Sequence, residues 1–296
     1  MSHLPGAAVV AATALCGTGT ATVTSAETGE QVGVVHARTA AGEVVVLLTA
    51  DGAARLGAEG GPDVAVRLEV VVEAALPDLT VPRAQLVLDG WLAPLADADV
   101  GAALDATCAL GDLAELHAHW PDAVLAAVEP AAARLHWPEG CTDVPVEDLA
   151  RAVPDPVTLR EGHVLARVEA ELGDRLVGLV QGMGHVHPAP GGAGSGAPST
   201  GRDLARVEEV RCVGADRHGL VLRCRTSTPW AGQVCCAGAS HGDAPCAAST
   251  TASLRLLFPS PVADADAAVD ALALLVLGAS ASDPARCPYA PGRRPA

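Results

Sequence analysis

The first half of the chain is a succession of short apolar segments separated by tight turns, and this pattern restricts the fold more than any other feature. Residues 18–25, 31–38 and 43–49 are separated by ETGE and TAAGE, which are good hairpin turns. Two further strand-like segments follow at 63–72 and 82–92. Because consecutive strands joined by tight turns pair antiparallel, these segments predict an antiparallel barrel or sandwich.

The remaining part of this half is mixed. Residues 51–60 form a Gly-rich, helix-like stretch, and residues 98–120 turn helical. Residues 123–137 return to a strand pattern, with an expected break at Glu129-Pro130. We therefore expect a β-rich first domain over residues 1–150.

A domain boundary is predicted near Val153-Pro154-Asp155-Pro156, since paired prolines interrupt both helix and sheet. Asp155 is expected to cap the next helix, with Pro156 at its first position. Glu171 and Arg175 are four residues apart on that helix and are expected to form an exposed pair. The elements expected in this second domain, residues 155–280, are a helix ending near Gly182, strands at 207–213, 219–225 and 252–258, and a helix at 263–277. The predicted class is α+β.

Two insertions of low complexity interrupt the second domain, at residues 185–201 and 227–249, and residues 281–296 form a tail. The second insertion contains Cys235, Cys236, His241 and Cys246. Zinc ligands are usually spaced Cys-x2–4-Cys, and adjacent cysteines cannot easily aim two thiolates at one ion. No metal site is therefore predicted, and the role of this cluster stays open.

Charge and composition exclude several classes of partner. The 296 residues carry 35 acidic and 19 basic side chains, a formal net charge of −16, with six aromatic rings. Nucleic-acid binding is not expected, because it needs basic tracks and stacking platforms. No basic residue precedes Arg38, and Thr, Gly and Ser interrupt the apolar N-terminal run, so neither a signal peptide nor a membrane span is predicted. Nine scattered cysteines indicate free thiols, and we expect a cytoplasmic protein.

Three stretches of the sequence carry a family resemblance. The first is GVVHAR…GEVVVLLTADG…PDVAVRLEVV…PRAQLVLDGWLAPL, from Gly33 to Leu95. The second is AVPDPVTLREGHVLARVEAELGDRLVGLV, and the third combines VRCVGADRHGLVLRC with SLRLLFPSPVADADAAVDALALLV. The first resembles the split β-barrel of the pyridoxamine-phosphate oxidase-like superfamily, in its haem-utilisation (HugZ-like) branch. The other two resemble the small domain of unknown function that follows the barrel in that branch.

The resemblance implies an antiparallel split β-barrel that forms a homodimer and binds FMN or haem near the dimer interface. In flavin-binding relatives, a Thr at a strand end and a basic residue after it hold the cofactor phosphate. Thr49 and Arg55 are the matching positions, and a hydroxyl donor with a fork-shaped cation suits a phosphate. The Ser that usually precedes the basic residue is replaced by Ala53.

For haem, His36 and Arg38 are the predicted pocket residues, as an axial ligand and a propionate partner. In the haem-utilisation branch the ligand tends to come from the C-terminal region, where the chain offers His218, His241 and Tyr289. Relatives often carry a His…Asp-His pattern on the first helix of the second domain. That pattern is replaced here by Arg167, Glu171 and Leu172, with His163 one turn earlier.

Two classes of function therefore remain open at the level of sequence. One is an FMN- or haem-binding split-barrel protein with flavin- or haem-linked redox activity. The other is a non-catalytic regulatory or protein-binding module that kept the fold and lost the cofactor. The missing Ser, the missing helix histidines and the shortage of aromatic rings motivate the second class. The sequence identifies neither catalytic residues nor a substrate.

Overall fold

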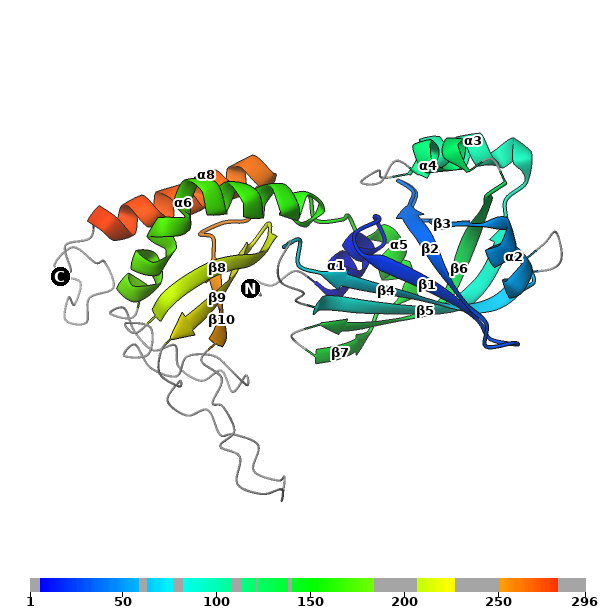
Figure 1. Cartoon of the computed structure of the whole chain (residues 1–296), viewed down its shortest axis with the longest axis horizontal. Coiled ribbons are helices and arrows are strands. Elements are labelled where there is room, and N and C mark those ends of the chain that lie inside the picture. Colours follow the sequence, from blue (N-terminus) through cyan, green and yellow to red (C-terminus); the bar gives the residue numbers. More distant parts are fainter. Residues whose placement is uncertain are drawn as a thin grey trace, which may run out of the picture. The chain divides into compact units, whose positions relative to one another are not determined.

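The structure is a computed structural model that describes residues 6–58, 63–76, 82–107, 113–120, 122–137, 140–183, 207–226 and 251–281. The chain divides into two compact units, residues 1–155 and 156–296 (Figure 1). None of the helices in the described ranges is long and apolar enough to cross a membrane.

The first unit is a closed antiparallel barrel of six strands. Their order is β3-β2-β1-β4-β5-β6, and pairing between β3 and β6 closes the barrel. A short seventh strand, β7, extends the sheet beyond β6. The strands are β1 (Thr20–Ser25), β2 (Gln31–Arg38), β3 (Val44–Leu48), β4 (Val64–Glu73), β5 (Pro82–Pro94), β6 (Val124–Trp137) and β7 (Gly140–Asp143). The predicted fold class, an antiparallel split β-barrel with a second α+β part, is confirmed.

The expected break of β6 at Pro130 is wrong, because the strand continues through the proline. Its pairing with β5 shifts register between Asp89 and Gly90, and Gly90 lies opposite Pro130. Proline lacks the N–H that a regular ladder needs, and a bulge is where a strand tolerates it. A Cβ at Gly90 would overlap the carbonyl oxygen of Glu129, so the close approach of the two backbones at this bulge requires glycine.

Alternating side chains fill the barrel interior. Leu68, Leu86, Leu88 and Leu135 are fully buried on the inner face. Two helices pack on this core, α1 (Ala7–Ala14) and α5 (Val146–Arg151), which also contact one another.

The outer face of β2 and β3 is covered as well. A small apolar cluster lies there, made of Ala37, Val45, Leu47, Leu113 and Leu125. Residues of α3 (Asp97–Asp105) and α4 (Leu113–His119) pack over this cluster. The remaining helix of the unit, α2 (Ala50–Leu56), follows β3 directly.

The second unit is a three-stranded antiparallel sheet with two helices on one face (Figure 1). Its strand order is β10-β9-β8. The elements are the 3-10 turn η1 (Thr158–Arg160), α6 (Glu161–Met183), β8 (Val207–Asp216), β9 (Gly219–Thr226), β10 (Thr251–Leu257) and α8 (Ala265–Ala281).

The start of α6 differs from the prediction. The helix begins at Glu161 after a 3-10 turn, and not at Pro156. Two side chains fasten this start to β8: the Thr158 hydroxyl donates to the Ala215 carbonyl at 3.1 Å, and the Glu161 carboxylate accepts from the Ala215 N–H at 2.8 Å. Tertiary hydrogen bonds therefore set the position at which the helix begins.

The expected pair of Glu171 with Arg175 is also replaced by another. Glu171 accepts a hydrogen bond from Arg167, one turn earlier, at 2.8 Å. Arg167 is shared, since it also donates to Asp266 of α8 at 2.7 Å. The arginine thus links the two helices across their exposed edge.

Candidate functional site

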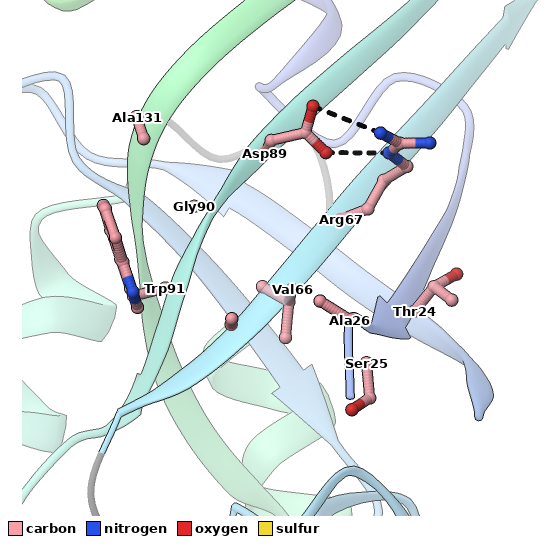
Figure 2. Close-up of a pocket in the computed structure, with 10 residues that line it drawn as sticks. Thr24, Ser25, Ala26, Val66, Arg67, Asp89, Gly90, Trp91 and Ala131 are labelled. Carbon is pink, nitrogen blue, oxygen red and sulfur yellow. Dashed lines mark hydrogen bonds and ion pairs between the residues drawn. The ribbon is translucent and has the colours of Figure 1, made fainter. Parts of the chain in front are cut away.

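A groove of about 460 Å³ lies on the outer face of the barrel, over β4 and β5 (Figure 2). Gly90, which carries no side chain, lies between Val66 of β4 and Pro130 of β6. Figure 2 shows Trp91 on one side of Gly90 and the Arg67–Asp89 pair on the other. The lining residues are Thr24, Ser25, Ala26, Ala65, Val66, Arg67, Asp89, Gly90, Trp91 and Ala131.

The two sides of the groove differ in chemistry. Trp91 is 46% exposed, and its indole offers a flat apolar surface with a ring nitrogen that can donate. Opposite it, the Arg67 guanidinium binds the Asp89 carboxylate through two hydrogen bonds, Nε–Oδ1 at 2.7 Å and Nη2–Oδ2 at 3.3 Å. The hydrogen bond and the charge of Asp89 raise the pKa of Arg67, so it stays a cation. The groove can therefore hold a flat apolar body next to a cationic side chain.

Sequence reasoning did not single out this groove. Trp91 counted only as one of six aromatic residues, although the alternation that buries Leu88 and Leu92 already places it on the outer face of β5. A Gly-Trp pair inside an apolar strand was the available signal, since an interior strand glycine often marks a bulge.

The predicted phosphate residues Thr49 and Arg55 lie at the two ends of α2. The Thr49 hydroxyl caps the helix, accepting a hydrogen bond from the Gly52 N–H at 3.1 Å. Arg55 forms an ion pair with Glu30, Nη2–Oε2 at 2.7 Å, and donates to the Gln31 carbonyl at 3.1 Å. A phosphate would have to displace the Glu30 carboxylate from this guanidinium, so the pair as it stands does not fit the group.

The predicted haem residues His36 and Arg38 are both 3% exposed and lie on β2. His36 Nε2 is 2.9 Å from the carbonyl oxygen of Ala14, at the end of α1. A carbonyl only accepts, so Nε2 carries the hydrogen. Burial lowers the pKa of His36, with the bond to Ala14 acting in the opposite sense, and the ring is therefore neutral at pH 7.

Arg38 binds α5, the other helix that packs on the barrel core. Its Nη2 donates to the carbonyls of Leu149 and Ala150, at 3.2 and 2.8 Å, at the end of α5. Its Nε has no hydrogen-bond partner among the described residues. In this conformation His36 and Arg38 connect β2 to α1 and α5, and neither side chain faces the groove lined by Trp91.

The other histidines do not converge on one site in the part of the chain that is described. His218 lies in the β8–β9 turn, where its backbone N–H donates to Asp216 at 2.8 Å. His163 Nε2 lies 3.6 Å from Asp266 Oδ1. The described residues contain no group of three or more His, Cys, Asp or Glu able to hold a metal ion. Tyr289, His241 and the cysteines Cys235, Cys236 and Cys246 lie outside the described residues.

Comparisons with known proteins bear on the fold. No family model and no curated protein matches the sequence. A haem-binding protein from Mycobacterium smegmatis matches in structure with a TM-score of 0.53 and 20% identity, over 94% of this chain and 99% of that chain. A protein of unknown function from Agrobacterium tumefaciens str. C58 matches with a TM-score of 0.37 and 15% identity, over 91% of this chain and 95% of that chain. An FAD- and haem-binding protein from Mycobacterium smegmatis matches with a TM-score of 0.28 and 22% identity, over 47% of this chain and 75% of that chain.

The first of these matches spans both units. The chain therefore has the fold of a split β-barrel followed by an α+β part, and the fold that the sequence resemblance implied is confirmed.

Proposed function

We propose that this protein binds haem, as a split-barrel protein of the haem-utilisation type. The observation that carries the proposal is the match to a haem-binding protein over 94% of this chain, which includes the barrel and the second unit together. The match also covers 99% of the M. smegmatis protein, so it includes residues of both units and not of the barrel alone. Bound haem would supply the redox chemistry of its iron.

The groove beside Trp91 fits the body of such a ligand. Haem presents a flat apolar ring and two carboxylates, and the groove combines an exposed indole, small lining side chains and the Arg67 cation. Arg67 is held by Asp89 through two hydrogen bonds, so a propionate would have to displace that carboxylate, just as a phosphate would have to displace Glu30 from Arg55. None of the described residues that line the groove is His, Cys, Tyr or Met, so these residues supply no ligand to the iron.

His36 remains our proposal for the iron ligand, for a haem that would bind at the α1 end of β2 and not in the Trp91 groove, which His36 does not line. His36 is neutral, as iron ligation requires. Because it is buried, ligation needs α1 to move away from β2, which would break the bond from Nε2 to the Ala14 carbonyl and free that nitrogen. Arg38, on the same strand, would then be available to a propionate of that haem.

Flavin binding through Thr49 and Arg55 is the less favoured form of the proposal. Their present partners are Gly52 and Glu30, and Ala53 is buried where relatives place a Ser. If FMN binds, Thr49→Ala and Arg55→Ala should each weaken it. Unchanged affinity in both variants would refute this phosphate site.

A non-catalytic regulatory or protein-binding module is the second candidate function. It is favoured by one observation: all four predicted cofactor residues hold contacts within the fold. Any enzymatic activity would depend on a bound cofactor. For both candidate functions we propose that the protein is a cytoplasmic homodimer.

An absorption titration separates these functions. Purified protein is titrated with hemin and, separately, with FMN, and we expect a Soret band that saturates at one hemin per chain. Trp91→Ala should weaken hemin binding about fivefold or more, since loss of a stacked ring removes on the order of 1 kcal/mol. Trp120→Ala is the matched control, because Trp120 is also 46% exposed and lies outside the groove. If neither hemin nor FMN binds at micromolar concentration, the proposal of cofactor binding is wrong, and the non-catalytic regulatory or protein-binding module is the remaining candidate.

A further inference from the structure

A cysteine and a histidine face each other on the hairpin formed by β6 and β7. The register pairs His136 directly with Cys141, so both side chains lie on the outer face of the sheet. Cys141 Sγ is 3.7 Å from His136 Nε2, within hydrogen-bond distance for sulfur. Both residues are exposed, and Cys141 is a free thiol. A thiol with an imidazole at this distance has a base available to take its proton.

The next pair along the same hairpin supplies a positive charge. Arg134 lies opposite Asp143 and donates to its carboxylate, Nε–Oδ1 at 2.8 Å. The Asp143 hydrogen bond and charge raise the pKa of Arg134, and the charge of the Cys141 thiolate raises it further. Cys141 therefore has a base on one side and a cation nearby.

A small hollow of about 190 Å³ lies next to the pair on the outer face of the sheet. Val87 of β5, Arg134 and His136 are among the described residues that line it, and Cys141 lies beside His136 without lining it. The hollow leaves room for a small reagent beside the imidazole. It shares Arg67 and Asp89 with the Trp91 groove, but the Cys141–His136 pair is outside that groove.

The other cysteines in the described ranges have a different environment. Cys16, Cys212 and Cys224 are all buried. Burial raises the pKa of the Cys224 thiol to about 12, so it stays protonated at neutral pH. Within the described part of the chain, exposure, a neighbouring base and a neighbouring cation occur together only at Cys141.

We propose that Cys141 is a redox modification site, oxidised by hydrogen peroxide to a sulfenic acid with His136 as the base. His136 takes the thiol proton, and the thiolate attacks one peroxide oxygen. The S–O bond forms as the O–O bond breaks, so sulfur loses two electrons and the peroxide gains them. The leaving hydroxide takes the proton from the imidazolium and leaves as water. The balance is RSH + H2O2 → RSOH + H2O, and a thiol reductant reverses it.

The test uses the full-length protein in its native state at pH 7. Hydrogen peroxide is added with a dimedone trap for sulfenic acid, and labelling of each cysteine is followed over time by peptide mass spectrometry. We expect Cys141 to be labelled while Cys16, Cys212 and Cys224 are not. His136→Asn should slow labelling of Cys141 about fivefold or more, because asparagine keeps hydrogen-bonding groups but cannot take a proton.

His119→Asn is the matched control, since His119 is an exposed histidine on α4 whose ring nitrogen Nδ1 contacts the Glu115 carbonyl of its own helix. Labelling of Cys141 should be unchanged in it, and circular dichroism should show that both variants stay folded. Labelling of Cys141 in His136→Asn at a rate within twofold of the parent would overturn the role of His136. Equal labelling of the three buried cysteines in the native protein would overturn the selectivity of Cys141. The proposal does not depend on a bound cofactor, so neither outcome bears on haem binding.

Discussion

The hydroxyl of Thr13 accepts a hydrogen bond from the backbone N–H of Asp155 at 2.8 Å, although 142 residues separate them. The same hydroxyl donates to the Val9 carbonyl at 2.7 Å, within α1. One side chain therefore fastens the first helix of the barrel unit to its last residue. Thr13 is 3% exposed, so water cannot replace either bond.

Thr13→Val should lower the free energy of unfolding by about 1–2 kcal/mol, because it leaves the buried N–H of Asp155 without this acceptor. Thr13→Ser keeps the oxygen and should cost much less. Urea denaturation of the three proteins measures the difference. Equal stability of the Val and Ser variants would show that the hydrogen bond to Asp155 contributes nothing.

His36 should make the stability of the protein depend on pH. Burial lowers its pKa in the folded state below the ordinary value of 6.5. As the pH falls below 6.5, the unfolded chain binds a proton that the folded chain does not, so the free energy of unfolding decreases. The decrease is at most about 1.4 kcal/mol per pH unit and ends below the folded-state pKa.

The measurement is a set of urea denaturation curves between about pH 7.5 and 5, spanning the ordinary histidine pKa, for the parent protein and for His36→Gln. The variant lacks this titrating group, so its stability should fall less on acidification. Parallel pH profiles for the two proteins would contradict the assignment of a lowered pKa to His36.

The course of the barrel strands could be predicted from the sequence because turn and strand signals are local. The ETGE turn and the alternation on either side of it place β1 and β2 to within two residues. The start of α6 could not be predicted, because the bonds of Thr158 and Glu161 to Ala215 come from a strand more than 50 residues away. Local capping rules favoured Asp155, whose N–H is bonded to Thr13.

The candidate site was harder to predict than the fold for the same reason. The sequence around Arg55 suggests a free cation, but β2 begins next to α2 and brings Glu30 to it from 25 residues away. The partner of His36 on α1 is likewise distant in sequence. The Trp91 groove is lined by residues of four strands, and the pairing of those strands is not encoded by any local pattern.

Gly90→Ala should destabilise the barrel strongly, by about 2–4 kcal/mol, because its methyl group would overlap the Glu129 carbonyl at the bulge. The backbones of β5 and β6 would have to separate where Pro130 already interrupts the ladder. Thermal and urea denaturation report the loss. Gly33→Ala, on β2, is the matched control, because a Cβ there meets nothing within 4 Å and should leave stability almost unchanged. Similar midpoints for the two variants would show that the bulge can relax.

The second unit contains a largely buried ion pair between β8 and β10. Arg255 Nη2 lies 2.5 Å from Asp216 Oδ2, and the two side chains are 22% and 6% exposed. The other carboxylate oxygen accepts a hydrogen bond from the backbone N–H of His218. The single carboxylate of Asp216 therefore both orders the β8–β9 turn and neutralises the arginine.

Asp216→Ala should lower the free energy of unfolding by about 2–3 kcal/mol, because it leaves a partly buried guanidinium without its carboxylate and removes the bond to the turn. Glu209→Ala is the control within the same sheet. Its partner Arg225 is about half exposed, and such surface pairs contribute at most about 1 kcal/mol. Urea denaturation at low and high salt distinguishes the two pairs, since salt screens the exposed pair and not the buried one. A loss in Asp216→Ala no larger than in Glu209→Ala would mean that solvent already compensates Arg255.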